Sequence, residues 1–196
     1  MKLLVATRNK GKIREIKELL NGLAFEVTSL LDHDDMPDIV EDGKTFAANA
    51  VKKALTIAQI TGGLVMGEDS GLEVKALGNK PGIYSARFSG ENATDEKNNA
   101  KLLKELESVP MAKRQARYRC FIALADKDRV IGIVNGSCGG CIATHPRGSN
   151  GFGYDPYFII PRYNKTFGEL DPAVKAQISH RARAMKKFLQ LIKKLS

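Results

Sequence analysis

From its first residues the chain alternates between short apolar runs and segments of helical periodicity, an order that favours folds combining a sheet with covering helices. The pattern predicts strands at 2–6, 25–29 and 64–69, because each is a short run of apolar or β-branched residues. It predicts helices at 11–20 and 45–60, where apolar residues return every three or four positions. A β-α-β-α-β opening of this kind indicates an α/β fold with a mixed sheet.

The remainder of the chain continues the same alternation. Residues 94–107 predict a helix that begins at Thr94 or Asp95. The stretches ARYRCFIALAD (116–126) and RVIGIVNGS (129–137) predict an antiparallel pair joined by a short polar turn. We find no internal repeat, low-complexity segment or long linker, so we expect a single domain over residues 1–196, at most divided into two lobes.

The composition excludes several classes of protein. At 196 residues the chain can bury a substantial core, and no apolar run approaches the roughly 20 residues that span a bilayer. The apolar part of the opening MKLLVATRNK is too short for a signal peptide. Three cysteines suit a reducing compartment better than a disulfide framework. We therefore expect a cytoplasmic protein with no membrane partner.

The net charge of +9 indicates a polyanionic partner, a description that fits nucleic acid, a membrane surface and a phosphorylated small molecule equally. Much of the excess lies in the final segment, SHRARAMKKFLQLIKKLS, where lysine and arginine fill one face. Its apolar residues recur at helical spacing: Ala182, Met185, Phe188, Leu189, Ile192 and Leu195. We interpret it as an amphipathic helix packed on the core with a solvated basic face.

A polar turn, ATRNKGK, separates the first predicted strand from the first predicted helix. A helix N-terminus offers free N–H groups and a positive dipole end to an anion. Thr7 and Asn9 could add side-chain donors, and Lys12 a charge for phosphate oxygens. The turn lacks the two-glycine frame of a Walker loop, and many turns of this kind only begin a helix.

A second cluster lies in VEDGKTFAANAVKKA, which Thr45 caps as a helix. Glu41 and Asp42 precede the helix, and Asn49 and Lys53 lie one turn apart on one face. These residues could line a site beside the core. A capped helix with ordinary surface polar residues would give the same pattern.

Two acids, Glu68 and Asp69, stand at the end of a predicted buried strand, where Ser70 and Gly71 are expected to turn the chain sharply. An unpaired buried carboxylate is costly, so two of them need a partner. Mg²⁺ would provide one, because it binds carboxylate oxygens and keeps water and substrate phosphates as other ligands. A solvent-exposed strand end is the competing interpretation.

The stretch GSNGFGYDPYFIIP (148–161) combines three glycines with two aromatic rings and an acid, Phe152, Tyr154 and Asp155. Rings on a glycine-rich turn need a ligand or a core to cover them. Further on, SHR (179–181) places two basic residues at a helix start, where they oppose the helix dipole. A bound anionic or carbonyl-bearing ligand would explain that pattern, and so would tolerance of a small penalty.

Together and in order, ATRNKGK, EDGKTFAANAVKKA, EDSGL, PGIYSARF, GSNGFGYDP, KTFGEL and KAQISHR resemble the inosine/xanthosine triphosphate pyrophosphatases, which remove non-standard purine nucleotides from the pool. GSNGFGYDP and SHR are the most specific blocks. The resemblance implies an elongated mixed β-sheet flanked by helices, with a nucleotide cleft between two lobes, and a homodimer. It also implies hydrolysis between the α- and β-phosphates with Mg²⁺.

The resemblance also implies a role for each motif residue. Asp69 falls on the acid that holds or activates the attacking water, and Glu41 on a metal-site acid; we expect Glu68 to complete the metal site. The expected substrate-binding residues are Thr7, Asn9, Lys12, Asn49, Lys53, Ser70, Phe152, Tyr154, Asp155, Lys175, Ser179, His180 and Arg181. No covalent nucleophile is required, so neither Ser70 nor a cysteine is assigned that role.

Within this set the residue types suggest a division of work. Lys53 and Lys175 match phosphate-binding lysines, and Phe152 is the expected stacking partner of a purine ring. Tyr154 would wall the base pocket or pack behind it, and Asp155 could steer Arg181 through a charge-assisted hydrogen bond.

Two features depart from the family pattern. Ala48 stands where the family often has a glutamate, which leaves Glu41, Glu68 and Asp69 to bind metal. CGGC (138–141) has the spacing of half a zinc site, which His145 and Cys120 could complete. The family has no metal there, and we interpret the glycines as a hairpin turn.

Two alternatives remain open from the sequence. One is a Maf-like nucleotide pyrophosphatase of different specificity. The other is a basic nucleic-acid-binding module that uses the C-terminal helix; against it, the aromatic residues are confined to one loop instead of alternating with Lys and Arg along a surface. We therefore expect a nucleoside triphosphate as the ligand and no nucleic-acid partner.

Overall fold

The computed structural model describes residues 1–33 and 35–194. The strands are β1 Lys2–Val5, β2 Glu26–Ser29, β3 Val65–Val74, β4 Gln115–Ala125, β5 Val130–Ile142, β6 Phe158–Ile160 and β7 Lys165–Thr166. The α-helices are α1 Lys10–Leu20, α2 Phe46–Thr61, α3 Asp95–Glu105, α4 Pro172–Ile178 and α5 His180–Ile192. The 3₁₀ turns are η1 Leu30–Asp32, η2 Lys75–Leu77, η3 Gly82–Arg87, η4 Met111–Lys113 and η5 Asp155–Tyr157.

The seven strands form one sheet in the order β2-β1-β3-β4-β5-β6-β7. Strand β1 pairs in parallel with both β2 and β3, whereas β6 pairs antiparallel with β5 and with β7. The mixed α/β sheet flanked by helices that the sequence predicts is therefore confirmed. Among the described residues, no helix has both the length and the apolar character needed to cross a bilayer.

The chain forms two compact units. Unit 1 comprises Met1–Asp69, Cys120–Gly136 and the segment from Arg181 onward, and unit 2 comprises Ser70–Arg119 and Ser137–His180. Strands β3, β4 and β5 each contribute residues to both units.

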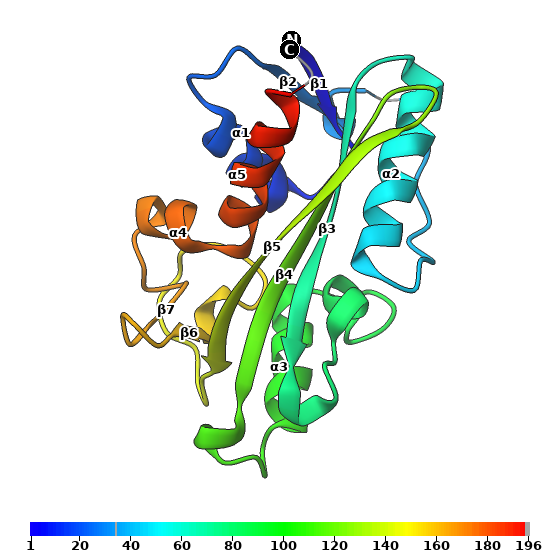
Figure 1. The fold of residues 1–196 in the computed structure, drawn as a ribbon. Helices are drawn as coiled ribbons and strands as arrows, with labels where there is room; N and C mark the ends of the chain where they lie inside the picture. Colours follow the sequence, from blue (N-terminus) through cyan, green and yellow to red (C-terminus); the bar gives the residue numbers. More distant parts are fainter. Residues whose placement is uncertain (34, 195–196) are drawn as a thin grey trace. The chain divides into compact units, whose positions relative to one another are not determined.

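Unit 1 buries apolar residues on both faces of its strands. Helices α1 and α5 cover one face, where Met66 of β3 packs with Ile16 and Phe188. Helix α2 covers the other, where Val65 packs with Ala50 and Ala54 (Figure 1). The predicted C-terminal amphipathic helix is thus present as α5, with Ala182, Met185 and Phe188 buried; Leu195 lies outside the described residues.

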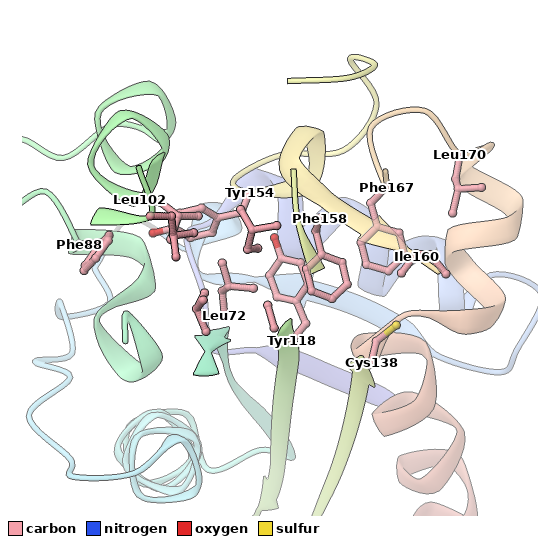
Figure 2. Close-up of a cluster of buried hydrophobic side chains, with 14 residues drawn as sticks. Leu72, Phe88, Leu102, Tyr118, Cys138, Tyr154, Phe158, Ile160, Phe167 and Leu170 are labelled. Atoms are coloured by element: carbon pink, nitrogen blue, oxygen red, sulfur yellow. The ribbon is translucent and has the colours of Figure 1, made fainter. Parts of the chain in front are cut away.

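Unit 2 has a core rich in aromatic side chains. The rings of Tyr118 and Phe158 lie 4.7 Å apart, and those of Phe158 and Phe167 lie 5.4 Å apart. Figure 2 shows this group, with Tyr154 beside Leu102 in the same cluster. Tilted and offset ring pairs of this kind add about 0.5–1.5 kcal/mol each beyond simple burial.

The expected helix starts are confirmed by their caps. The Thr45 hydroxyl accepts a hydrogen bond from Ala48 N at the start of α2, and the Thr94 hydroxyl accepts one from Lys97 N at the start of α3. Helix α1 begins after Asn9, whose side chain accepts from Lys12 N. A side-chain cap of this kind contributes about 0.5–2 kcal/mol to helix stability.

Two predicted turns are wrong. Ser70 and Gly71 do not turn the chain, because β3 continues to Val74 with Leu72 and Val74 fully buried. Cys138–Cys141 is not a hairpin turn but part of β5. At Gly140 a Cβ atom would lie 2.7 Å from Cζ of Phe158, so the glycine permits close packing instead of a turn.

Helix α4 was not predicted from the sequence, although its start is well marked. Asp171 caps the helix by accepting from Ala173 N, and Pro172 occupies the first helical position. Its seven residues show too little periodicity to distinguish this short helix from the beginning of α5. The predicted helix start at Ser179 is correct, since α5 begins at His180.

Gly67 sets how closely α2 approaches β3. A Cβ atom at this position would collide with Ala50 O and lie 2.7 Å from Ala54 N. Both atoms belong to the backbone of α2, so the whole helix would have to shift to make room. We predict that Gly67→Ala lowers the free energy of unfolding by about 1–3 kcal/mol through overpacking. Urea denaturation followed by circular dichroism measures this loss.

Gly139→Ala is the matched control, because a Cβ atom there meets nothing within 4 Å. Equal stability of the Gly67→Ala variant and the parent would contradict the proposed close approach.

Candidate functional site

Glu68 lies at the centre of the first cluster of charges in unit 1. Its side chain is fully buried, and its Oε2 lies 2.8 Å from Lys12 Nζ. Its Oε1 accepts from Arg181 Nη2 at 3.1 Å and from Cys120 Sγ at 3.2 Å. Burial alone would raise the pKa of Glu68, but Lys12 and Arg181 hold it well below its usual range. The carboxylate is therefore ionised and paired.

Arg181, at the first turn of α5, is fully buried and has a second acidic partner. Its Nη1 donates to Glu15 of α1. Burial would lower the pKa of Arg181, but the Glu68 and Glu15 carboxylates raise it. We call Lys12, Glu15, Glu68 and Arg181 the Glu68 cluster; its two cations and two carboxylates sum to zero charge.

Asp69, the next residue along β3, belongs to a different group. Its Oδ2 accepts from Asn49 Nδ2 at 3.0 Å, and its Oδ1 lies 3.5 Å from Lys53 Nζ. Lys53 also donates to Glu41 Oε1 at 2.6 Å. Burial raises the pKa of Asp69, while Lys53 and Lys12 act in the opposite direction. We call Glu41, Asn49, Lys53 and Asp69 the Asp69 cluster.

The two clusters lie on opposite faces of β3. Successive side chains of a strand point to opposite faces, so Glu68 follows Met66 toward α1 and α5, and Asp69 follows Val65 and Gly67 toward α2. This alternation explains why two adjacent acids have different partners. The competing interpretation of these acids as a solvent-exposed strand end is wrong, since both acids are buried.

The carboxylates of the Asp69 cluster suit a hard cation. Both Glu41 and Asp69 reach the same ammonium group, so their oxygens lie near one another. One cation and two carboxylates give this cluster a charge of −1. Mg²⁺ is commonly held by one or two carboxylates with water and phosphate completing the shell. Glu41 and Asp69 therefore fit Mg²⁺.

Glu68 does not fit the same role, because this single carboxylate has two cations of its own, Lys12 and Arg181, whereas Glu41 and Asp69 share one. Within residues 1–33 and 35–194, no three His, Cys, Asp or Glu side chains gather to hold a metal ion. The expected set of three acids is thus divided by the two faces of β3. The imagined zinc site is likewise not assembled in that part of the chain, where Cys120, Cys138 and Cys141 are free thiols.

In the turn before α1, the predicted residues Thr7 and Asn9 make hydrogen bonds with nearby backbone groups. Thr7 Oγ1 accepts from Asn9 N at 3.2 Å, and Asn9 Oδ1 accepts from Lys12 N at 2.9 Å. Both residues are therefore fixed by the start of the helix. Lys12, one turn further along, directs its ammonium group to Glu68.

In unit 2, Asp155 organises the glycine-rich loop. Its Oδ2 accepts from Phe152 N at 2.9 Å and from Lys175 Nζ at 2.6 Å. Gly151 has φ of +82°, and a Cβ atom there would collide with this carboxylate. Phe152 is half-buried, and Lys175 Nζ lies 5.3 Å from the centre of its ring. The loop thus holds a ring, an acid and a lysine together.

The other predicted residues of unit 2 are more deeply placed. Tyr154 is buried and its hydroxyl donates to Ser85 O at 2.8 Å. Of the two positions expected for this ring, it therefore occupies the one packed behind the loop. The His180 ring is buried and stacks on Tyr118 at 4.5 Å. Ser179 is buried directly before α5, and Ser70 is half-buried on β3.

Three residues of these contacts were missed in the sequence. Glu15 lies three positions after Lys12, so the helical period could have placed it on the same face. From β4, Cys120 contacts Glu68 and Tyr118 contacts His180. The partners in each pair are more than 50 residues apart in the chain, and no local pattern signals such pairs. The expected bond between Asp155 and Arg181 stays a prediction.

The sequence of residues 3–191 matches the Ham1 family. The chain belongs to the Ham1 family. A dITP/XTP pyrophosphatase of Desulforamulus reducens is 50% identical over 195 residues, covering 100% of this chain and 97% of the relative. One of Geobacter sulfurreducens is 53% identical over 184 residues, covering 94% and 92%.

Solved structures of the Ham1 family agree. A HAM1 protein of Coxiella burnetii has a TM-score of 0.88 at 38% identity, with 99% of each chain covered. The Ham1 protein of Staphylococcus aureus has a TM-score of 0.88 at 36% identity, with 100% of each covered. These comparisons confirm the resemblance read from the motifs.

Glu68 provides a test of the Glu68 cluster. Removing one partner of a buried pair leaves the other charges uncompensated, which costs about 3–5 kcal/mol. We predict that Glu68→Gln, which keeps the side-chain size but leaves Arg181 and Lys12 with less negative charge, lowers the free energy of unfolding by that amount. Urea denaturation measures the change.

Glu26→Gln is the matched control, because Glu26 makes an exposed contact with Lys2 at 3.9 Å. Its removal should change stability by less than about 1 kcal/mol. If both variants behave alike, the Glu68 cluster does not stabilise unit 1.

Proposed function

We propose that this Ham1 protein hydrolyses non-standard purine nucleoside triphosphates, ITP, dITP and XTP, to the monophosphate and pyrophosphate. The observation that carries the proposal is Asp69, a buried carboxylate held between an amide and a lysine. Two relatives whose sequences are 50% and 53% identical to this chain are dITP/XTP pyrophosphatases, which supports the same reaction here.

The phosphates would be bound by cations and by the start of α1. Lys12, Lys53 and Lys175 each already contact a carboxylate, so each can exchange or share that partner with a phosphate oxygen. The first N–H groups of α1 have no partner within the helix and favour an anion. Thr7 and Asn9 flank that terminus and would contact the same phosphates.

Asp69 would position the attacking water. Burial raises its pKa, which makes the carboxylate a better proton acceptor than an exposed aspartate. Asn49 and Lys53 fix its two oxygens in orientation. When bound at Glu41 and Asp69, Mg²⁺ would supply charge neutralisation for the triphosphate. The lysines stabilise the charge that develops on the leaving pyrophosphate, so no covalent intermediate is needed.

The base would be held by the glycine-rich loop of unit 2. Phe152 offers a ring face to a purine, and such stacking contributes about 1–3 kcal/mol per base. Ser179, His180 and Arg181 would read the base edge, where hypoxanthine and xanthine present a 6-oxo acceptor and adenine a 6-amino donor. An N–H donor facing the amine would be left unpaired, which costs roughly 1–3 kcal/mol.

Three further properties belong to the same proposal. The substrates are nucleotides of the cytoplasmic pool, so the protein would act in the cytoplasm. The whole chain would work as one domain and, as the family resemblance implies, as a homodimer. Sedimentation velocity at several protein concentrations tests the dimer directly.

The substrate preference tests the function. We predict that kcat/KM for ITP, dITP and XTP exceeds that for ATP by tens- to hundredsfold, because one unpaired buried donor costs roughly 1–3 kcal/mol. GTP shares the 6-oxo group and should be intermediate or poor, because its 2-amino group needs room and an acceptor. Pyrophosphate release, coupled to inorganic pyrophosphatase, measures each rate.

The same panel separates the alternatives. A Maf-like enzyme would prefer dTTP or another pyrimidine substrate. A nucleic-acid-binding module would release no pyrophosphate and would instead give a salt-dependent gel shift with DNA or RNA. Equal rates with ATP and ITP would overturn the selective base pocket.

Replacing Asp69 tests the chemical step. We predict that Asp69→Asn lowers kcat for ITP at least about a hundredfold with a much smaller change in KM, because an amide cannot accept the proton of water. The control is Asp42→Asn, since Asp42 is an exposed acid of the same region that pairs with Lys52. A variant at Asp69 with near-parental kcat would remove this residue from the reaction.

A further inference from the structure

Helix α3 contacts the glycine-rich loop through two side chains that the function above leaves without a role. Gly153 N donates to Asp95 Oδ2 at 2.7 Å, and Asn99 Nδ2 donates to Gly153 O at 3.0 Å. Asp95 and Asn99 lie one helical turn apart, so they reach both polar groups of a single residue. Asn99 is buried, so its bond is protected from competition by water.

Gly153 stands between the two rings of the loop. On one side Phe152 N is held by Asp155, and on the other the Tyr154 hydroxyl is held by Ser85 O. Tyr154 also packs beside Leu102 of α3 in the buried cluster (Figure 2). The loop is therefore fixed at three successive residues, and α3 provides the contacts to the middle one.

The backbone of this segment does not favour one conformation by itself. Gly153 has φ of +61° and Gly151 has φ of +82°, both in the left-handed region. Glycine adopts this region about as readily as the conformations with negative φ, so the chain alone does not select it. Fixing such residues costs conformational entropy, and bonds made by a charged carboxylate and a buried amide offset it. Asp95 and Asn99 thus select the loop conformation that presents Phe152.

We propose that Asp95 and Asn99 are positioning residues for base recognition, acting through Gly153 on the Phe152 ring. Neither would touch the substrate. This inference rests on the proposed function, because it assumes that Phe152 stacks on the base. It goes beyond it by assigning base binding in part to a helix that lies outside every motif of the family resemblance.

Kinetics of Asp95→Ala and Asn99→Ala with ITP and ATP test the proposal. A loop released from α3 would stack less often, so KM for ITP should rise about tenfold with kcat changed less than about twofold, the effect of one lost hydrogen bond. KM for ATP should rise by a similar factor, because stacking does not distinguish the two purines. Asp95→Asn, whose amide oxygen can still accept from Gly153 N, should restore the parental KM.

Arg114→Ala is the stability control. Arg114 is buried and donates to Leu106 O and Val109 O just after the other end of α3, so it holds the helix without touching the loop. A purely structural loss lowers the active fraction and hence kcat for all substrates, whereas KM stays unchanged. Thermal melting of each variant shows how much fold is lost.

Hydrogen exchange of the peptide covering 148–157 gives a measurement independent of activity, with faster exchange expected in Asp95→Ala and Asn99→Ala than in Arg114→Ala. Parental KM and parental exchange in both α3 variants would overturn the inference. Failure of the proposed function is distinguishable, since the unmodified protein would then release no pyrophosphate from ITP. If Phe152→Ala alone leaves KM unchanged, the ring is not the stacking partner and the inference also fails.

Discussion

The rest of unit 1 depends on one constraint, the burial of two adjacent carboxylates on β3. A buried charge must be paired, and two side chains that follow one another on a strand point to opposite faces. Glu68 and Asp69 therefore need partners from different elements. Helices α1 and α5 supply Lys12 and Arg181 on one face, and α2 supplies Asn49 and Lys53 on the other.

The helix packing follows from this pairing. Lys12 and Arg181 come from opposite ends of the chain, and both must reach one carboxylate, which fixes α1 and α5 on the same face of β3. On the other face, Gly67 lets α2 approach so closely that short side chains such as Asn49 reach Asp69. The close contact and the charge pairs thus reinforce one another.

Much of the fold could be read from the sequence because its signals are local. Thr45 and Thr94 cap helices whose period is regular, and the apolar runs of β1 and β2 are short and well separated. The errors arise where residues typical of one local structure adopt another because of tertiary packing. Ser70 and Gly71 resemble a turn, yet buried Leu72 and Val74 continue the strand.

The residues of the candidate site could be predicted from the sequence, but the contacts between them could be predicted less well. Motifs identified the charged residues, whereas their pairing depends on contacts over long separations in the chain. Arg181 and Glu15 are 166 positions apart, and nothing near either residue indicates the other. The split of Glu68 from Asp69 could have been read from the alternation of side chains along a strand, because the predicted strand 64–69 already contains both acids.

The charges of the two clusters also divide the proposed work. The Glu68 cluster is neutral, with two cations and two carboxylates, so it holds Arg181 in one orientation without attracting a further cation. The Asp69 cluster has one lysine for two carboxylates and a charge of −1, so under the proposed function it would attract a divalent cation and, through that cation, phosphate. Placing the acids side by side on β3 lets one strand fix Arg181 on one face and Asp69 on the other. Under the proposed function, the arginine would read the base and the carboxylate would position the attacking water.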